Sequence, residues 1–417
     1  MRILVLGSGG REHALVWRLH QEKRAEIYAC PGNPGMARLA TCIPLSGGSP
    51  EDYLSVAKSI GADLTIAGPE APLVAGVADL FHQHSLHLFG PSRAAARLEG
   101  SKIFAKRVMS AARIPTARYV EADTVDQALE ALPRFEYPIV IKADGLAAGK
   151  GVILAGDLHE ARAAIELLTT QFGPRLILEE FLEGEEASFI VLCDGRHALP
   201  LAPAQDHKRV FDGDQGPNTG GMGSYSDDRI LDPNQIQEVM DLIIHPLLDY
   251  LASSGTPFLG FLYAGLMLTS AGPKVLEFNV RLGDPEAQSL LHRLRGGLLE
   301  AVTAAVRGSM QGYSLDWDSR PSVCVVLAAE GYPSAVRSGD TIEGIAAAEA
   351  TGATVFHAGT RLVDARLVTA GGRVLGVTHT GGDLAAAIQN TYRAVSCIHF
   401  PGMHFRKDIG KKGLRRW

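Results

Sequence analysis

The chain has 417 residues, of which 46% are hydrophobic and 21% are charged, values typical of ordinary globular domains. Its formal net charge of -6 gives no general attraction to polyanions, which argues against a nucleic-acid or anionic-membrane partner. The length exceeds what one hydrophobic core usually organises, so we expect about two or three domains.

Cysteine usage and the N-terminal residues indicate the compartment. The cysteines are scattered and show no C-x-x-C spacing, so neither a zinc site nor a disulfide framework is expected. The apolar stretch at residues 3–6 is too short for a signal peptide, and no later run approaches the length needed to cross a membrane. A cytoplasmic location is therefore expected.

Residues 1–101 are expected to form an N-terminal parallel βα domain. Short apolar runs alternate there with helical patterns, the runs at 3–6, 27–30, 64–67 and 86–89 and the patterns at 12–20, 52–60 and 71–82. The first turn reads Gly7-Ser8-Gly9-Gly10-Arg11-Glu12. Unpaired N–H groups at a helix start favour a phosphate there. A dinucleotide fingerprint is disfavoured, because Glu12 and Cys30 replace its third glycine and its ribose-binding acid. A tight turn built only for packing is the alternative.

Residues 102–315 are expected to form a second unit, which starts with a helix N-capped by Ser101. A small α+β subdomain at 118–187 is predicted from strand and helix patterns, and residues 188–315 form the central part. The loop at 142–151 joins two strands, and its small residues let backbone amides close over a polyphosphate, while Lys142 and Lys150 neutralise charge. It lacks the G-K-[ST] of a P-loop. A flexible hairpin is the alternative.

Two further segments of this unit could contact ligands. Residues 179–186 read EEFLEGEE and could offer backbone groups to adenine and a carboxylate to ribose, although acidic runs are usually solvated. Residues 203–225 are rich in Gly, Asp, Asn and Pro and show little periodicity, which predicts a long loop of the kind that is often functional.

The segment EFNVRLGDPE at 277–286 carries the strongest chemical signal. Strand periodicity puts Val275, Glu277, Asn279 and Arg281 on one face, with Leu276, Phe278, Val280 and Leu282 on the other. Oxygen donors two residues apart suit Mg²⁺ on nucleotide phosphates, and an adjacent arginine suits an anionic substrate or a transferring phosphoryl group. A solvated strand face is the alternative, and Asp284-Pro285 could simply start a helix.

Residues 316–417 are expected to form a small C-terminal α+β domain. Strand-like runs and one helical pattern support it, the runs at 322–328, 354–356, 361–363 and 373–377 and the helix at 383–397. The basic tail, residues 406–416, is expected to be a solvated end.

Taken in order, these segments resemble the phosphoribosylamine–glycine ligase family of the ATP-grasp superfamily. The resemblance spans nearly the whole chain and rests on the joint occurrence of GGREHA, PGNPG, GPEAPL, EGSK, KADGLAAGKGV, EEFLEGEEASF, QDHKR, GPNTGGMG, GFLYAGLM and EFNVRLGDPE. It implies an ATP-grasp domain at 102–315, with an ATP lid at 118–187, between the βα and C-terminal domains.

The resemblance also assigns residues. ATP phosphates would be held by Lys102, Lys142, Gly145, Ala148, Gly149, Lys150 and Gly151, adenine by Glu179, Glu180, Phe181 and Leu182, and ribose by Glu186. Mg²⁺ or Mn²⁺ would bind Glu277 and Asn279. Phosphoribosylamine would contact Gly9, Gly10, Arg11, Glu12, Gly68, Pro69 and Glu70. Glycine and the reacting phosphoryl group would be surrounded by Arg209, Asn218, Gly220 and Asp284, together with the catalytic residues Asp206, Lys208 and Arg281.

The implied reaction joins glycine to 5-phosphoribosylamine through glycyl phosphate, with ATP as co-substrate. It needs no protein nucleophile, which agrees with a sequence that shows no Ser-His-Asp or Cys-His signature. Another ATP-grasp purine-pathway enzyme, such as a carboxylase, and a nucleotide-binding regulator without chemistry are the alternatives. We expect a monomer that acts on small molecules.

Overall fold

The computed structural model describes residues 1–147 and 150–416. Five parallel strands form the N-terminal sheet in the order β3-β2-β1-β4-β5, which confirms the predicted parallel sheet. Their bounds are β1 (Arg2–Gly7), β2 (Glu26–Pro31), β3 (Thr41–Cys42), β4 (Leu64–Ala67) and β5 (Leu88–Phe89). The helices between and after them are α1 (Gly10–Glu22), α2 (Pro50–Ile60), α3 (Glu70–Ala75), α4 (Val77–Gln83) and α5 (Arg93–Gly100).

The helix expected at 71–82 is two helices. Gly76 separates α3 from α4 and has φ +96°, a left-handed conformation that glycine adopts without steric cost. The chain turns there, so a single helical period does not persist across it.

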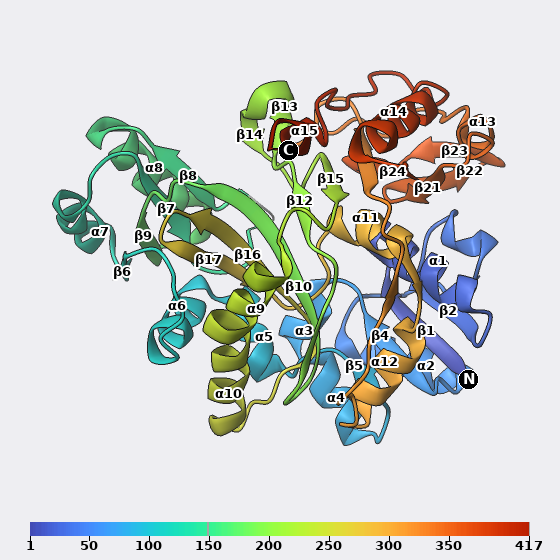
Figure 1. Cartoon of the computed structure of the whole chain (residues 1–417), viewed down its shortest axis with the longest axis horizontal. Helices are drawn as coiled ribbons and strands as arrows, with labels where there is room; N and C mark the ends of the chain where they lie inside the picture. The colour runs from blue at the N-terminus through green and yellow to red at the C-terminus, as the bar shows by residue number, and fades with distance from the viewer. Residues whose placement is uncertain (148–149, 417) are drawn as a thin grey trace.

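A small four-stranded antiparallel sheet follows, in the order β6-β9-β7-β8. It contains β6 (Tyr119–Ala122), β7 (Ile139–Ala143), β8 (Val152–Ala155) and β9 (Leu176–Glu180), with α7 (Val125–Ala131) and α8 (Leu158–Phe172). Ile141, Ile165 and Leu178 belong to a core cluster of its own. The subdomain projects from the left of the molecule, with α6 (Lys102–Ala111) leading into it (Figure 1). Ser101 caps α6, accepting from the N–H of Phe104 at 3.1 Å as expected of an N-cap.

The central sheet runs through the middle of the molecule and into its C-terminal part. Its order is β17-β16-β10-β12-β15-β20-β24-β21, with β11 paired to β10. The bounds are β10 (Glu185–Asp194), β11 (Ala198–Pro200), β12 (Ala204–Asp206), β15 (Gly223–Ser226), β16 (Leu259–Thr269), β17 (Gly272–Asn279), β20 (Ser322–Ala328), β21 (Thr354–His357) and β24 (Arg373–Thr380). The C-terminal strands therefore continue the central sheet.

The prediction of an irregular loop over 203–225 is wrong in part, because β12 and β15 from this stretch lie inside the central sheet. Between them, β13 (Arg209–Phe211) and β14 (Gln215–Asn218) form a separate hairpin. Strands of three or four residues are too short to give a readable hydrophobic period.

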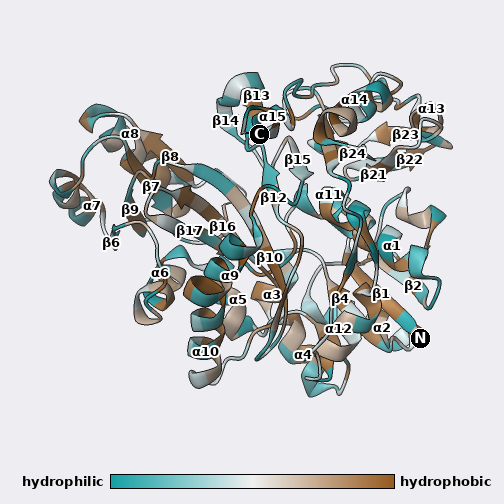
Figure 2. Ribbon diagram, viewed as in Figure 1, coloured by the Kyte–Doolittle hydropathy of each residue, from teal (hydrophilic) through white to brown (hydrophobic). Residues whose placement is uncertain are grey.

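The other helices and short strands complete the fold. They are α9 (Pro233–Val239), α10 (His245–Ser253), α11 (Glu286–Arg293), β18 (Leu294–Gly296), α12 (Leu298–Val306), β19 (Asp316–Trp317), α13 (Ile345–Glu349), β22 (Thr360–Val363), β23 (Arg366–Thr369), α14 (Leu384–Val395) and α15 (Lys411–Arg416). Hydrophobic residues gather along the sheet strands and hydrophilic ones along outer helix faces (Figure 2). Among the described helices, none combines the length and the apolar character needed to cross a membrane.

Two expectations are corrected by the packing. A register shift in the β16–β17 pair sets Gly265 opposite Glu277 and Leu266 opposite Val275, which leaves Leu276 as an extra residue. Val275 therefore joins the core with Phe278, and the predicted alternation holds only from Glu277 onward. The prediction that the basic tail is a solvated end is wrong for Arg406, whose side chain is fully buried, whereas Lys407, Lys411, Lys412 and Arg415 are exposed.

Candidate active site

Two lysines share one buried carboxylate where the small subdomain meets β17. Glu179, at 2% exposure, accepts from Lys142 Nζ at 3.0 Å, and Lys106 Nζ lies 3.1 Å from the same oxygen. Lys142 also donates to the carbonyl of Leu276 at 3.2 Å. Burial lowers the pKa of Lys106 to about 8 although Glu179 opposes the shift. The other Glu179 oxygen, Oε1, is buried and has no hydrogen-bond partner within the described residues.

The residues predicted to hold phosphates lie next to this cluster. Lys102 Nζ donates to the carbonyl of Gly145 at 2.8 Å, and burial lowers the pKa of Lys102 while Glu277 opposes the shift. Gly145 has φ +98°, which favours glycine, and Lys150 is exposed. A side chain at Gly151 would come within 2.6 Å of Ala147. The predicted residues Ala148 and Gly149 lie outside the described residues.

The segment predicted to bind adenine and ribose follows β9. Glu180 accepts from the N–H of Arg118 at 2.9 Å, Phe181 is 41% exposed, and Leu182 is buried in a small apolar cluster. Glu186 forms an ion pair of 2.8 Å with Lys208, which lowers the pKa of Glu186. The structure thus places the segment at the border of the two sheets.

Glu277 is surrounded by positive charge. Burial alone would raise its pKa, but Lys208, Lys142, Lys102 and Arg281 together bring the pKa of Glu277 below its ordinary value. The carboxylate therefore stays ionised, which is the form that binds a divalent cation. The described residues contain no group of three or more His, Cys, Asp or Glu that could hold a metal by themselves. Glu277 and Asn279 offer a carboxylate and an amide oxygen, which are donors that Mg²⁺ accepts.

Arg281 connects β17 to the N-terminal domain. Its guanidinium donates to Glu99 at 2.7 Å, to Glu70 at 3.2 Å and to the Asn279 side-chain oxygen at 3.2 Å. Glu99 also accepts from the N–H of Val280 at 2.8 Å. Burial raises the pKa of Glu99, whereas the pKa of Glu70 is lowered because Arg281 and Arg11 outweigh burial. One arginine is therefore held between two carboxylates.

In the glycine-rich turn at the start of α1, the protein itself supplies an anion, the carboxylate of Glu12. Glu12 accepts from the N–H of Gly9 at 2.6 Å and from Arg11 at 2.5 Å, so the N–H predicted to meet a phosphate is occupied by a carboxylate. Side chains at Gly9 and Gly68 would approach Glu12 to 2.8 and 2.3 Å, which explains the glycines. A side chain at Gly10 would likewise come within 2.5 Å of Gln288 Nε2.

Arg11 and Glu70 extend this turn toward Arg281. Arg11 Nη1 donates to the carbonyl of Leu282 at 3.1 Å, and Arg11 Nη2 lies 3.8 Å from Glu70. Pro69 precedes α3 and Glu70 opens it. The residues predicted to contact phosphoribosylamine, which come from two separate turns, are therefore brought together.

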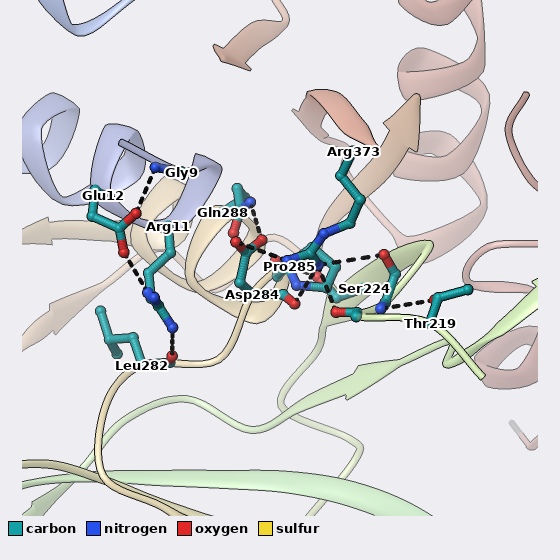
Figure 3. A network of polar contacts seen from close by, with 12 residues as sticks. Gly9, Arg11, Glu12, Thr219, Ser224, Leu282, Asp284, Pro285, Gln288 and Arg373 are labelled. Carbon is teal, nitrogen blue, oxygen red and sulfur yellow. Dashed lines mark hydrogen bonds and ion pairs between the residues drawn. The ribbon is translucent and has the colours of Figure 1, made fainter. Parts of the chain in front are cut away.

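A polar network joins the 219–224 loop to Asp284 (Figure 3). Arg373 from β24 donates to the carbonyls of Gly220 at 2.5 Å and Asp284 at 2.7 Å, and its Nη2 lies 3.1 Å from the Asp284 carboxylate. Gln288 donates to the same carboxylate at 2.8 Å. The pKa of Asp284 is lowered because Arg373 and Arg11 outweigh burial. Asp284 thus serves as an anchor rather than a helix cap, and α11 starts only at Glu286.

Three family models match consecutive parts of the chain. They are described as phosphoribosylglycinamide synthetase N domain, ATP-grasp (A) domain and C domain, and match residues 1–99, 100–287 and 322–412.

The chain belongs to the phosphoribosylglycinamide synthetase family.

Relatives of full length agree with this family. The chain is similar to phosphoribosylamine–glycine ligase from Pseudomonas aeruginosa, at 49% identity over 100% of this chain and 99% of the relative. The crystal structure of phosphoribosylamine–glycine ligase from Thermotoga maritima matches with TM-score 0.86 and 36% identity, covering 98% of this chain and 100% of that one. Campylobacter jejuni biotin carboxylase shares the fold alone, with TM-score 0.71 and 15% identity over 99% and 95% of the two chains.

Further charged groups lie beside Glu277, among them Asp206 and Lys208. Burial and the nearby Glu286 raise the pKa of Asp206 to about 8, although Lys208 opposes the shift. Glu286 accepts from Ser188 Oγ at 2.8 Å, and that hydroxyl lies 3.0 Å from the Tyr263 hydroxyl. Glu186, Asp206 and Glu277 raise the pKa of Lys208 against its burial. Asp206 and Lys208, both predicted to be catalytic, therefore lie in one electrostatically coupled group.

Arg209 and Asn218, also predicted to contact substrate, pair with each other at the base of the β13–β14 hairpin. Arg209 Nη1 donates to the carbonyl of Gly216 at 2.6 Å, inside the hairpin. Arg209 and Asn218 are therefore part of the hairpin that directly follows Lys208 in the chain.

Sequence reasoning missed several polar residues of this family member's site. They are Glu99, Lys106, Glu286, Gln288 and Arg373. Lys106 could have been found, because it lies four residues after Lys102 and so on the same face of α6. Arg373 gives no local signal, because it reaches Gly220 across 153 positions of the chain.

Proposed function

We propose that the chain joins glycine to 5-phosphoribosylamine with ATP, giving glycinamide ribonucleotide, ADP and phosphate in de novo purine biosynthesis. The observation that carries the proposal is an ionised Glu277 among Lys102, Lys142, Lys208 and Arg281, in a chain that belongs to this family over its whole length. The cations of such a site neutralise the charge of a polyphosphate, and the Glu277 carboxylate offers an oxygen ligand to the metal ion that the polyphosphate binds.

The nucleotide half of the proposal places ATP between the four-stranded sheet and β16–β17. Use of ATP follows from the ATP-grasp domain of this family. Adenine would lie along residues 179–182, where the unpartnered Oε1 of Glu179 is an acceptor for its exocyclic amine. Glu186 would accept a hydrogen bond from a ribose hydroxyl. Lys102, Lys142, Lys150 and the 145–151 loop would face the phosphates.

The metal would be Mg²⁺ or Mn²⁺, held by Glu277 and Asn279. When bound, it would neutralise charge on the phosphate oxygens. Asn279 is suited to this because its side-chain oxygen retains a lone pair besides the one used by Arg281. The described residues supply too few ligands for a closed metal cage, which supports a metal that arrives with the nucleotide.

In the first step, a glycine carboxylate oxygen attacks the γ-phosphorus, and the bond to the β-phosphate oxygen breaks. This gives glycyl phosphate and ADP. The lysines and Arg281 would hold the reacting groups in line and stabilise the charge that develops. Asp206, Lys208 and Asp284 would orient glycine from the opposite side.

In the second step, the amine of phosphoribosylamine attacks the glycyl carbonyl carbon, phosphate leaves and one amine proton is released. Gly9–Glu12 and Gly68–Glu70 would contact phosphoribosylamine, with Arg11 as the cation at that turn. Arg209, Asn218 and Gly220 would complete the glycine side. No covalent bond to the protein is needed.

The proposal also covers assembly and location. The chain would act as a cytoplasmic monomer on small molecules, without nucleic acid or membrane. Its five cysteines are all free, which suits a reducing compartment. The units would be residues 1–101, 102–315 and 316–417.

Isotope transfer tests the acyl phosphate directly. Glycine labelled with ¹⁸O in its carboxylate should deliver one labelled oxygen to the inorganic phosphate formed with each amide. Mass spectrometry of that phosphate measures the transfer. Amide formation with unlabelled phosphate would contradict the proposed intermediate.

A further inference from the structure

The C-terminal strap, residues 404–412, docks onto the substrate hairpin, residues 209–218. Asp408 accepts from the N–H of Gly213 at 2.9 Å, and Asp212 accepts from the N–H of Lys407 at 2.7 Å. His404 Nε2 lies 2.8 Å from the carbonyl of Val210. These contacts run along both sides of the hairpin tip, and Figure 1 shows α15 beside β13 and β14.

Arg406 is the centre of this docking. Its side chain is fully buried and donates to the carbonyl of Arg209 at 3.0 Å and to Asp214 at 2.8 Å. Two further bonds of 2.7 Å go to Asp408, and Lys412 adds an ion pair of 2.8 Å with Asp214. A buried guanidinium with this many partners fixes the geometry of the groups around it.

The hairpin has little else to hold it. Hydrogen bonds and ion pairs join residues 209–218 to more distant parts of the chain. Within residues 1–147 and 150–416, all of these come from the strap. Most of its residues are exposed, and Val210 alone is buried, in a small apolar cluster with Met222. Packing by itself therefore fixes the hairpin weakly.

The base of the hairpin lies in the candidate active site. Thr219 donates to the carbonyl of Lys208 at 2.8 Å through both its N–H and its hydroxyl, which closes the base. Lys208 pairs there with Glu186, and Gly220 is held by Arg373. A shift of the hairpin would therefore displace the groups on either side of it.

We propose that Arg406 is a positioning residue: through the substrate hairpin it sets the placement of Lys208, Arg209 and Asn218 around glycine. The proposal rests on the proposed function, because it takes glycine as the ligand of this loop. It gives the C-terminal strap a role in substrate binding without contact to substrate.

The test compares Arg406→Ala, Arg406→Lys and Asp214→Asn with Lys411→Ala, a matched control at an exposed position of the strap. Rates of ADP release are measured against glycine and against ATP, and hydrogen exchange follows residues 209–218. We expect kcat/KM for glycine to fall roughly ten- to a hundredfold in Arg406→Ala, with the KM for ATP unchanged within about twofold. Asp214→Asn should shift the same constant in the same direction, and Arg406→Lys should recover part of the loss.

The outcomes separate the two proposals. Faster hairpin exchange with wild-type glycine constants in Arg406→Ala and Asp214→Asn would overturn the positioning role. If Arg406→Ala does not fold, Asp214→Asn decides, since its carboxylate side chain is 42% exposed and its loss leaves Arg406 paired with Asp408. A wild-type enzyme with no glycine-dependent ADP release would instead contradict the proposed function.

Discussion

The nucleotide side and the sugar side of the site balance charge in opposite ways. On the proposed nucleotide side, Lys106 and Lys142 share the single carboxylate of Glu179. On the proposed sugar side, Glu70 and Glu99 share Arg281. The first arrangement leaves positive charge for a polyanion to neutralise. In the second, the protein already supplies the anions, so a ligand there must be selected by shape and hydrogen bonds as much as by charge.

The largest effect is expected from Glu277→Gln, which removes the anion at the centre of the lysines. Turnover should fall roughly a thousandfold or more, about 4 kcal/mol in the activation barrier, because the metal loses its charged ligand. Thermal unfolding should stay near wild type, since the four cations lose a nearby negative charge but keep their hydrogen-bond and ion-pair partners. Steady-state ADP release measures the effect, with Glu183→Gln as an exposed control. Wild-type turnover in Glu277→Gln would refute the metal assignment.

On the sugar side, Arg281→Met should cost stability in addition to turnover. It leaves Glu99 without its cation and Glu70 with only the more distant Arg11. Because these pairs are partly buried, the loss should be smaller than the roughly 3–5 kcal/mol of a fully buried ion pair. Urea unfolding measures this loss. Adding Glu99→Gln to Arg281→Met should restore part of the stability, and a double variant no more stable than the single one would show that the two carboxylates do not depend on Arg281.

On the nucleotide side, Lys142→Met should mainly cost affinity. The KM for ATP should rise roughly tenfold through loss of a phosphate-facing cation. The fold should be retained, because Lys106 still neutralises Glu179. Initial rates at varied ATP test the first expectation and thermal unfolding the second. A large loss of stability with unchanged ATP kinetics would reverse the contrast between the two sides.

The smallest effect concerns pH. Burial and Glu286 raise the pKa of Asp206 from 3.8 to about 8, so the folded protein keeps a proton that the unfolded chain has lost. The contribution of this group to stability is therefore present at low pH and is lost as pH rises from about 4 to about 8. Asp206→Asn should flatten the pH dependence of urea unfolding over that window in the ligand-free enzyme. An unchanged slope would place the proton on another group near Asp206.

Long periodic elements could be predicted from the sequence, and short or coupled ones could not. The parallel strands and the Ser101 cap follow from local pattern. The extra residue Leu276 does not, because a bulge is decided by pairing with β16 and reverses the faces of the residues before it. The short strands β12 and β15 are likewise fixed by their neighbours in the sheet.

The candidate site shows the same division. Motif residues such as Lys142, Glu277 and Asp284 could be selected from the sequence, and the structure brings them toward one region. Arg373 could not, since its partner Gly220 lies 153 positions away in the chain. Arg406 was visible only as part of a basic tail, because its bond to Asp214 crosses 192 positions. The hydrogen bond from the N–H of Gly9 to the Glu12 carboxylate could not be predicted either, because only the structure shows where the Glu12 side chain lies.

ADP release with each substrate omitted in turn tests the central claim most directly. The account predicts release that requires ATP, a divalent cation and glycine, reaches its full rate only with phosphoribosylamine, and does not occur when bicarbonate and aminoimidazole ribonucleotide replace the two substrates. Release that ignores glycine but responds to bicarbonate and aminoimidazole ribonucleotide would contradict it.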